Sequence, residues 1–345
     1  MTQEKSLRVA VVGAGHIGRT HALVYQRHPR VDLVAIADII PEKAEALAKE
    51  VGAQAFASVD ALLAANLRLD AASVATKGEE NGGEHYAPTM ALLRAGIAVL
   101  GEKPISNRLE EGREMVAYAE NRHIPYAINL NHRFTPAAYR AKEWVEQGRL
   151  GTLHMLNMRM WINNPVESSP WFHLRALHPH SIDVLRYFGG EIARVAAFMV
   201  KGANRTIWSN TQVLLQFQSG AIGHLVGSYD AGASYGLEQL EVVGSAGRFV
   251  LEDACEALTY YPRRSIEVES YRYLGGMRSF GETFDSRIGT FVDQLLAGTP
   301  YDAIDGSGLD ALKAQEVIEA AIRSWETGSV VTLNEPDSAK EAHHD

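Results

Sequence analysis

The first part of the chain alternates short apolar runs with segments that carry one apolar face. Four runs have the length and the apolar, often β-branched composition of buried strands, at residues 8–12, 31–37, 71–75 and 97–100. Helical patterns cover residues 19–27 and 86–95, and Gly96 supplies a left-handed stop for the second. Strands that alternate with helices predict a parallel sheet with right-handed crossovers, as in an α/β doubly wound, Rossmann-type domain.

Past residue 126, apolar and polar positions alternate instead. Segments with this period span residues 153–161, 212–217, 221–227, 236–243 and 248–252. Short turns at residues 218–220 and 245–247 join neighbouring segments as hairpins. Helical patterns return at residues 284–296 and 308–325. Strands at hairpin spacing predict an α+β domain with a large, mainly antiparallel open sheet that packs one face on helices.

The change of period divides the chain into two domains and a tail. At 345 residues the chain is longer than most single domains, so two hydrophobic cores are expected. We place the parallel-sheet domain at residues 1–128 and the second domain at residues 129–333. The polar residues 334–345 are expected to form a frayed C-terminal tail.

Composition narrows the class of partner. The chain is 46% apolar and 22% charged, as in ordinary globular proteins, and its formal net charge of −9 repels nucleic acid and anionic membranes. The one cysteine, Cys255, allows no internal disulfide and fits a reducing compartment. The sequence has no apolar run of membrane-spanning length and no hydrophobic signal core near its start. We therefore expect a soluble, cytoplasmic protein.

A glycine-rich turn follows the first strand and opens the first helix. Its candidate ligand-binding residues are Gly13, Gly15, His16, Ile17 and Gly18. The first glycine permits the tight turn, the second lets the backbone approach a pyrophosphate, and the third lets the helix pack on the strand. The helix N-terminus then faces the phosphate charge. A GxGxxG pattern between a strand and a helix predicts dinucleotide binding.

Asp38 indicates which dinucleotide is bound. It follows the second predicted strand, about twenty residues after Gly18. An acid at this position accepts hydrogen bonds from the adenosine ribose hydroxyls and repels a 2′-phosphate. We expect NAD rather than NADP as the cofactor. The alternative is that Asp38 is an acid in a surface turn.

Polar residues also follow the later strands of this sheet. Thr76 follows the strand at residues 71–75, and Glu102 and Lys103 follow the strand at residues 97–100. Ligands of such sheets bind beyond the carboxyl ends of the strands, so these three residues are candidates for the cofactor crevice. The polar loop at residues 76–84 either covers the cofactor or substrate or is a mobile surface loop.

Three motifs in this order resemble the glucose–fructose oxidoreductase / inositol 2-dehydrogenase / rhizopine catabolism (Gfo/Idh/MocA) family. They are Glu102-Lys103-Pro104 after a parallel strand, NLNHRFTP at residues 129–136, and GSAG at residues 244–247. The resemblance implies an NAD-dependent oxidoreductase that moves a hydride between nicotinamide C4 and a carbinol carbon of a sugar, cyclic polyol or sugar derivative. It also implies that Lys103 lies beside the nicotinamide and the substrate hydroxyl. A desolvated lysine can exchange a proton near neutral pH.

The segment RALHPHSIDVLR, residues 175–186, holds the second catalytic candidate. Its helical end is similar to the family's pattern, and that register places the family's catalytic histidine at His180. The family usually has an aspartate four residues earlier, where this chain has Ala176. The carboxylate that would orient the histidine is therefore missing, and the full Lys–Asp–His relay is not implied.

A helix with a proline in its middle is expected around this segment. Ser169-Pro170 is a good cap and first-turn pair, Gly189-Gly190 is a good stop, and Pro179 should kink the helix between them. A continuous helix would place His173 and His180 on one face. His178 would point elsewhere, and a helix-end hydrogen bond is its favoured role.

The resemblance also suggests substrate contacts and assembly. The candidate substrate-binding residues are Asn131, Arg133, His173 and Arg175. The second domain would bind substrate and pair sheet faces into a homodimer or homotetramer. No metal is expected, either at His343-His344-Asp345 or among the three histidines of residues 173–180. Two other functions stay open: an NAD-dependent glycoside hydrolase that acts by transient oxidation and elimination, and a non-catalytic NAD-bound sensor.

Overall fold

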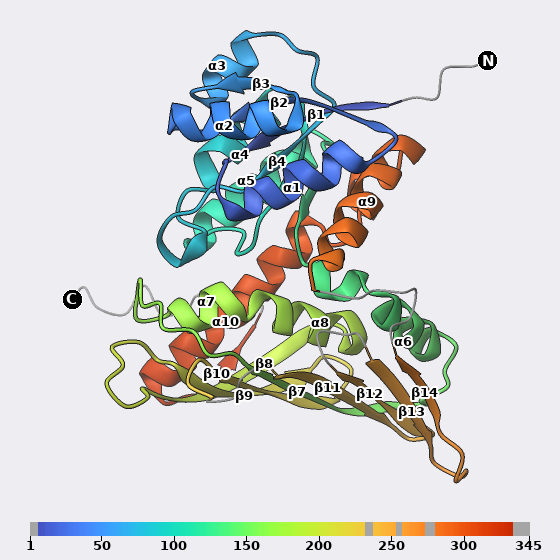
Figure 1. Ribbon diagram of the computed structural model, residues 1–345. Coiled ribbons are helices and arrows are strands. Elements are labelled where there is room, and N and C mark those ends of the chain that lie inside the picture. Colours follow the sequence, from blue (N-terminus) through green and yellow to red (C-terminus); the bar gives the residue numbers. More distant parts are fainter. Residues whose placement is uncertain (1–5, 232–236, 253–256, 273–279, 334–345) are drawn as a thin grey trace. The chain divides into compact units, whose positions relative to one another are not determined.

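The chain folds into two compact units (Figure 1). The structure is a computed structural model that describes residues 6–231, 237–252, 257–272 and 280–333. The first unit contains Met1–Thr135, Arg175–His180 and Gly275–Gln315, and the second contains Pro136–Leu174, Ser181–Leu274 and Glu316–Asp345. The first unit therefore includes two segments that follow residue 135 in the sequence.

Six strands form the parallel sheet of the first unit, in the order β3-β2-β1-β4-β5-β6. They are β1 (Leu7–Val12), β2 (Val31–Ala37), β3 (Gln54–Phe56), β4 (Ala71–Val74), β5 (Ala98–Gly101) and β6 (Tyr126–Ile128). The strand order reverses between β1 and β4, and doubly wound sheets bind ligands beyond the carboxyl ends of the strands at such a point. The predicted Rossmann-type domain is confirmed.

Helices cover both faces of this sheet. They are α1 (His16–Arg27), α2 (Pro41–Val51), α3 (Val59–Ala64), α4 (Tyr86–Arg94), α5 (Leu109–Asn121) and α9 (Glu282–Ala297), with the short 3-10 turns η1 (Glu79–Asn81), η2 (Asn131–Phe134) and η4 (Tyr301–Ala303). On one face Val9 and Val11 pack with Phe291 of α9, and on the other Val99 packs with Leu93 and Met115. Because both faces are covered, the strands are apolar at consecutive positions.

Helix α9 returns from late in the chain to pack on the first unit. Its Asp285 forms an ion pair of 2.7 Å with Arg27 of α1. Its Arg287 is fully buried and donates hydrogen bonds to the backbone carbonyls of Ile128, at 3.1 Å, and Gly306, at 3.2 Å. The pattern at residues 284–296 predicted the helix but not its partner, because the partners are distant in sequence.

Nine strands form the sheet of the second unit, in the order β14-β13-β12-β11-β7-β10-β9-β8-β15. They are β7 (Leu153–Trp161), β8 (Ile192–Val200), β9 (Asn210–Phe217), β10 (Ile222–Ser228), β11 (Leu237–Gly244), β12 (Gly247–Glu252), β13 (Ala257–Pro262), β14 (Glu269–Arg272) and β15 (Val331–Thr332). Strands β7 and β10 pair in parallel and the other pairs are antiparallel. The predicted large, mainly antiparallel sheet is confirmed.

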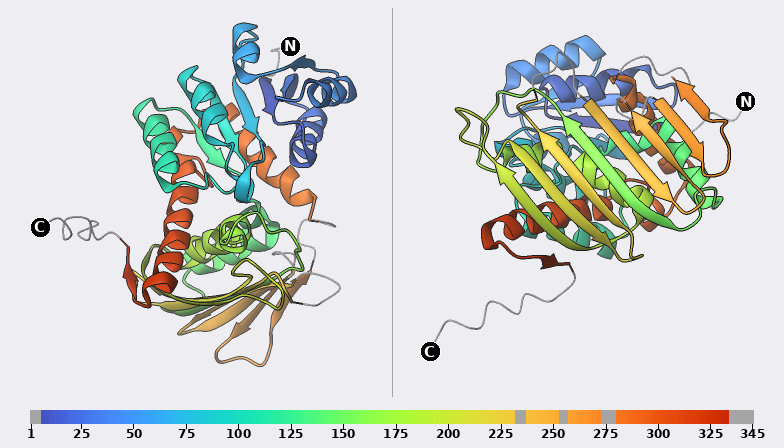
Figure 2. Two further views of the ribbon diagram at one scale, coloured as in Figure 1. Left: turned by 90° about the vertical axis from the view of Figure 1, so that its left-hand side faces the viewer. Right: turned by 90° about the horizontal axis from the view of Figure 1, so that it is seen from below.

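Helices cover one face of this sheet in the described part of the chain (Figures 1 and 2). The covering helices are α6 (Pro136–Glu146), α8 (Pro179–Gly189) from Ser181 onward, and α10 (Gly308–Thr327) from Glu316 onward. Phe188 of α8 contacts Phe249 of β12, with ring centroids 5.2 Å apart. The right-hand view of Figure 2 shows the opposite face without helices. None of the described helices combines the length and apolar composition needed to cross a membrane.

Candidate active site

The glycine turn leaves room for a ligand at one position and packs tightly at two. Gly13 has a φ of 99°, and a Cβ added there would lie 2.6 Å from the carbonyl oxygen of Ala75. A Cβ added at Gly18 would lie 1.7 Å from the carbonyl oxygen of Gly13. At Gly15 an added Cβ would meet no described atom within 4 Å. The turn is thus tightly packed on β4 and open where a pyrophosphate would approach.

Asp38 is fixed beside the same turn. One carboxylate oxygen accepts a hydrogen bond from the Ala14 N–H at 2.6 Å, and the other accepts from the Ile40 N–H at 2.8 Å. These bonds hold a negative charge at the carboxyl end of β2, next to the start of α1. Ribose hydroxyls can donate to such a carboxylate, whereas a 2′-phosphate would be repelled.

A cavity of about 510 Å³ opens along this edge of the sheet. Its lining includes Gly13, Gly15, Asp38, Ile39, Ile40, Lys43, Ser58, Thr76, Lys77, Gly78 and Glu84. This volume is in the range of cofactor sites. Helix α1 begins at His16, followed by Ile17, and no side chain caps it at Gly15, so its first N–H groups can face an anion. The donors, the open glycine and the fixed acid fit NAD.

The loop at residues 76–84 is tied down at several points. The Thr76 hydroxyl donates to the Glu84 carbonyl at 2.8 Å. Glu80 has a φ of 53°, and its buried carboxylate pairs with Arg175 at 3.0 Å. Arg175 was expected to bind substrate. In the structure its guanidinium forms an ion pair with the Glu80 carboxylate. The partners are 95 residues apart, so no local pattern could have predicted the pair.

Lys103 is buried just past β5. Its Nζ donates a hydrogen bond to the carbonyl oxygen of Ala176 at 2.9 Å. Burial lowers the pKa of Lys103, and the negative charge of Glu102 opposes that effect. The position where the family usually has an aspartate therefore contacts the lysine through its backbone. The Lys103–Pro104 peptide bond is cis.

Glu102 faces away from solvent and has two side-chain partners. One of its oxygens lies 2.9 Å from Nε2 of His21 and accepts from the Asn129 amide at 2.5 Å. Burial opposes ionisation of Glu102, but the hydrogen bond and charge of His21, with Lys103 and Asn129, hold its pKa below the ordinary value. His21 and Asn129 were not predicted as site residues, since their link to Glu102 is made across the fold.

His180 lies at the start of α8, in the same unit as Lys103. Burial lowers its pKa well below the ordinary value, and His132, Lys103 and His178 lower it further. Its ring stacks on His132, with centroids 4.1 Å apart and planes at 9°. Its Nδ1 has no hydrogen-bond partner among the described residues. His180 is therefore expected to be a neutral base, and His132 is a neighbour that the sequence did not single out.

The expected kinked helix is two helices. Helix α7 covers Phe172–Leu177, and α8 begins at Pro179. Proline is a favoured first helical residue because it lacks the N–H that would be unpaired there, so it starts a new helix instead of bending one. His178 lies at the break and is fully buried.

The other expected substrate residues lie in two places. In the first unit, Asn131 donates to the Thr283 hydroxyl at 2.5 Å, and Arg133 pairs with Asp305 at 3.1 Å and Asp310 at 3.2 Å. In the second unit, His173 is buried against Tyr229, with ring centroids 4.6 Å apart, and burial lowers its pKa to about 3. Their substrate roles stay predictions. The described residues contain no group of three His, Cys, Asp or Glu side chains placed to hold a metal ion.

Comparisons with known proteins agree over most of the chain. The family model "Oxidoreductase family, NAD-binding Rossmann fold" matches residues 7–130, and "GFO/IDH/MocA C-terminal domain" matches residues 139–250. Inositol 2-dehydrogenase of Rhizobium meliloti (strain 1021) is 26% identical over 342 residues, which cover 92% of this chain and 97% of that protein. D-glucoside 3-dehydrogenase of Escherichia coli (strain K12) is 33% identical over 155 residues, covering 44% of this chain and 43% of that protein.

A solved structure shares the fold. Levoglucosan dehydrogenase in complex with NADH and levoglucosan matches with a TM-score of 0.86 at 20% identity, covering 95% of this chain and 99% of that one. At this identity the likeness shows the fold alone. Because the family's models match both parts of the sequence, the chain belongs to the Gfo/Idh/MocA family and is an NAD-binding oxidoreductase.

Proposed function

We propose that the protein is a dehydrogenase that oxidises a secondary hydroxyl of a sugar, a cyclic polyol or a sugar derivative with NAD. The observation that carries the proposal is the buried Lys103, whose pKa burial lowers, at the strand edge that also lines the cofactor cavity. Relatives named for inositol, glucoside and levoglucosan oxidation support this substrate class. Bound NAD supplies the hydride acceptor.

Lys103 and His180 handle the hydroxyl proton in this proposal. A neutral Lys103 amine that donates one N–H to the Ala176 carbonyl keeps its lone pair for the substrate hydroxyl. Accepting that proton leaves the carbinol oxygen free to become a carbonyl as the hydride departs. His180 is neutral because of burial and can take the proton from the same group or pass it on. The rest of the task is to hold carbon and nicotinamide at reacting distance.

The charge balance around the site favours an uncharged polyol. Arg175 pairs with Glu80, and Arg133 pairs with Asp305 and Asp310. Both guanidinium charges are therefore balanced inside the protein. Contacts from these arginines and from Asn131 would reach substrate hydroxyls rather than a carboxylate or phosphate.

A substrate panel tests the proposal. Purified protein is mixed with NAD and with inositols, aldoses, glycosides and uronates, and NADH is followed by absorbance. We expect turnover with at least one uncharged polyol and none in a Lys103→Ala variant that still binds NAD. Aglycone release without net NADH would instead identify a glycoside hydrolase. Bound NAD with no chemistry in either direction would identify a sensor.

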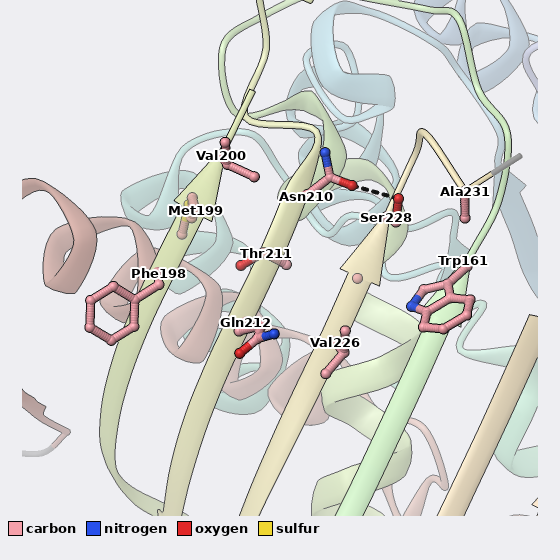
Figure 3. A pocket seen from close by; sticks show the side chains of 11 residues that line it. Trp161, Phe198, Met199, Val200, Asn210, Thr211, Gln212, Val226, Ser228 and Ala231 are labelled. Carbon is pink, nitrogen blue, oxygen red and sulfur yellow. Dashed lines mark hydrogen bonds between the residues drawn. The ribbon is translucent and has the colours of Figure 1, made fainter. Parts of the chain in front are cut away.

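We also propose that the helix-free face of the second sheet pairs with a second copy of the chain. Phe198 is 69% exposed, and Leu214 and Ile222 are each 54% exposed on this face. A depression of about 500 Å³ lies between β7, β8, β9 and β10 (Figure 3). Figure 3 shows Phe198 and Trp161 on opposite sides of it. Monomeric proteins seldom expose an apolar surface of this kind.

The assembly is tested by the mass in solution. Light scattering at micromolar concentration is expected to give a dimer or tetramer, and Phe198→Asp should reduce the mass to that of one chain. Ile266→Asp, at an exposed position in the turn between β13 and β14, is the matched control and should leave the assembly intact. A wild-type mass near 37.8 kDa would refute pairing.

We propose a cytoplasmic location, which rests on the single cysteine and on the use of NAD.

A further inference from the structure

A chain of buried polar groups leads from the first helix to the residue before Lys103. The Tyr25 hydroxyl lies 2.8 Å from the Ser73 hydroxyl, which lies 2.9 Å from Nδ1 of His21. Nε2 of His21 lies 2.9 Å from the Glu102 carboxylate, which also accepts from the Asn129 amide. All of these residues belong to the first unit, and each is buried. Their order links α1, β4 and β5.

The order serine, histidine, carboxylate occurs in hydrolases, but this arrangement cannot work in that way. A nucleophilic serine must reach a substrate. Ser73 lies on β4, inside the parallel sheet, and is 0% exposed. Its hydroxyl is hydrogen-bonded to both Tyr25 and His21. The group at the other end, Glu102, is the one that lies next to the proposed catalytic residue. The network therefore acts on Glu102.

The protons in the network can be assigned from Glu102. Its pKa is lowered, so the carboxylate is ionised and can only accept hydrogen bonds. Nε2 of His21 must then carry a hydrogen and donate a hydrogen bond to Glu102. The Ser73 hydroxyl is hydrogen-bonded to both Nδ1 of His21 and the Tyr25 hydroxyl. Each hydroxyl and each ring nitrogen of the network therefore has a partner, which holds the imidazole in place.

Glu102 in turn acts on Lys103. Burial favours the neutral amine, and the carboxylate charge favours the ammonium form. A buried carboxylate keeps its charge only where hydrogen bonds replace water. The His21 N–H and the Asn129 amide supply those bonds. A histidine of α1 is therefore hydrogen-bonded to the carboxylate whose charge acts on the lysine.

We propose that His21 is a positioning residue for Lys103. His21 acts by holding the Glu102 carboxylate ionised and directed toward α1. The inference rests on the proposed function of Lys103 as the group that accepts the substrate proton. His21 contacts neither substrate nor cofactor in this role. Its effect reaches the reaction through the hydrogen bond from His21 to Glu102 and through the charge of Glu102 beside Lys103.

The pH dependence of oxidation tests this role. Without His21, burial drives Glu102 to take up a proton, the pKa of Lys103 falls, and the amine becomes neutral at lower pH. His21→Leu should therefore move the acidic limb of the turnover profile to lower pH by about one pH unit. Glu102→Gln should move it in the same direction. Val24→Ala removes buried apolar atoms from the same helix and should lower the thermal midpoint without moving the limb.

The double variant separates this mechanism from a general packing effect. If His21 acts through Glu102, His21→Leu should add no shift to Glu102→Gln. An equal shift in both backgrounds, or no shift in the single variant, would overturn the inference. Where His21→Leu does not fold, His21→Gln keeps a donor for Glu102 and should give less than half of the shift.

A readout that does not need turnover keeps the two proposals apart. NMR titration of the 13C-labelled Lys103 side chain reports its proton equilibrium directly, and its resonance is assigned with Lys103→Arg. If the titration midpoint of Lys103 shifts in His21→Leu and the protein has no sugar activity, the result would support the inference and refute the proposed function. A titration that does not move would refute the inference even if the enzyme turns over.

Discussion

The two sheets of this protein bury their residues in different ways. All four residues of β5 are buried, whereas buried and more exposed positions alternate through β9. The parallel sheet has helices on both faces, so only its edge remains for ligands, and Asp38, Thr76 and Lys103 lie there. In the described part of the chain the second sheet has helices on one face, so its other face is the one proposed above to pair with a second copy. The burial pattern of a sheet thus indicates whether its edge or one of its faces is accessible to a ligand or to another chain.

Removing the lysine amine tests whether the chemistry belongs to the edge of the parallel sheet, and it has the largest expected effect. Lys103→Ala should lower turnover by about 10³–10⁴-fold, the upper part of the range for a general acid–base group. NAD affinity, measured by isothermal titration, should change little because Lys103 does not line the cofactor cavity described above. A turnover loss of less than tenfold would place the proton acceptor elsewhere.

Truncating neighbouring residues tests the difference in burial directly. In β5, Val99→Ala and Leu100→Ala should both destabilise the protein, by about 1–5 kcal/mol each, since each leaves a cavity. In β9, Leu215→Ala should cost about 2–5 kcal/mol, and Leu214→Ala should cost less than about 0.5 kcal/mol in the monomer. The free energies of unfolding of Leu214→Ala and Leu215→Ala are measured with urea in the Phe198→Asp background. In that background association between chains does not contribute to stability.

Similar losses for Leu214→Ala and Leu215→Ala in that background would contradict the alternation.

The two histidines around Pro179 test which of them takes part in the reaction. His180→Ala should lower turnover by about 10²-fold with NAD affinity unchanged. Since burial keeps His180 neutral into mildly acidic pH, the acidic limb should still follow Lys103 in this variant. His178→Ala should lower the thermal midpoint more than turnover, because His178 is fully buried at the helix break.

If His178→Ala abolishes turnover and His180→Ala does not, the assignment of the catalytic histidine is wrong by two residues. Measuring the thermal midpoint and NAD affinity of both variants distinguishes that outcome from unfolding.

Cofactor choice is the smallest expected effect. Wild-type protein should bind NAD at least about tenfold more tightly than NADP, because the fixed Asp38 charge repels a 2′-phosphate by about 1.4 kcal/mol or more. Asp38→Ser should reduce this preference, and Lys43, which also lines the cavity, should then assist NADP binding. Asp60→Ser, in the same lining, is the matched control. Equal affinities in the wild type would show that Asp38 does not reach the ribose.

Local patterns predicted β1, β2, β4 and β5, with the helices α1 and α4, and the cofactor turn, but they gave no expectation for β3, β6, α2, α3 or α5. The apolar run of β1 and the glycines after it are contiguous, and their roles depend on backbone geometry that short segments determine. The EKP motif was recognisable for the same reason. The break at Pro179 was expected only as a kink, because a proline inside a helical pattern can bend a helix or begin a new one, and the surroundings decide between them.

Pairings between distant segments had no such signal. Glu80 and Arg175 are 95 residues apart, and His21 and Glu102 are 81 residues apart. Each residue alone resembles an ordinary helix or loop position. The substitution of alanine at position 176 suggested a missing partner for His180, but not that the backbone there accepts a hydrogen bond from Lys103.

The sequence by itself predicted the two kinds of sheet, the dinucleotide turn and the family, because periodicity and contiguous motifs depend on neighbouring residues. The preference that Asp38 gives for NAD stays a prediction. Only the tertiary structure decided which charges are balanced, which histidine is neutral and which groups hold Glu102. Those properties depend on burial and on distances between segments that meet only after folding. A pKa belongs to such an environment, so it cannot be assigned to a residue before its neighbours are known.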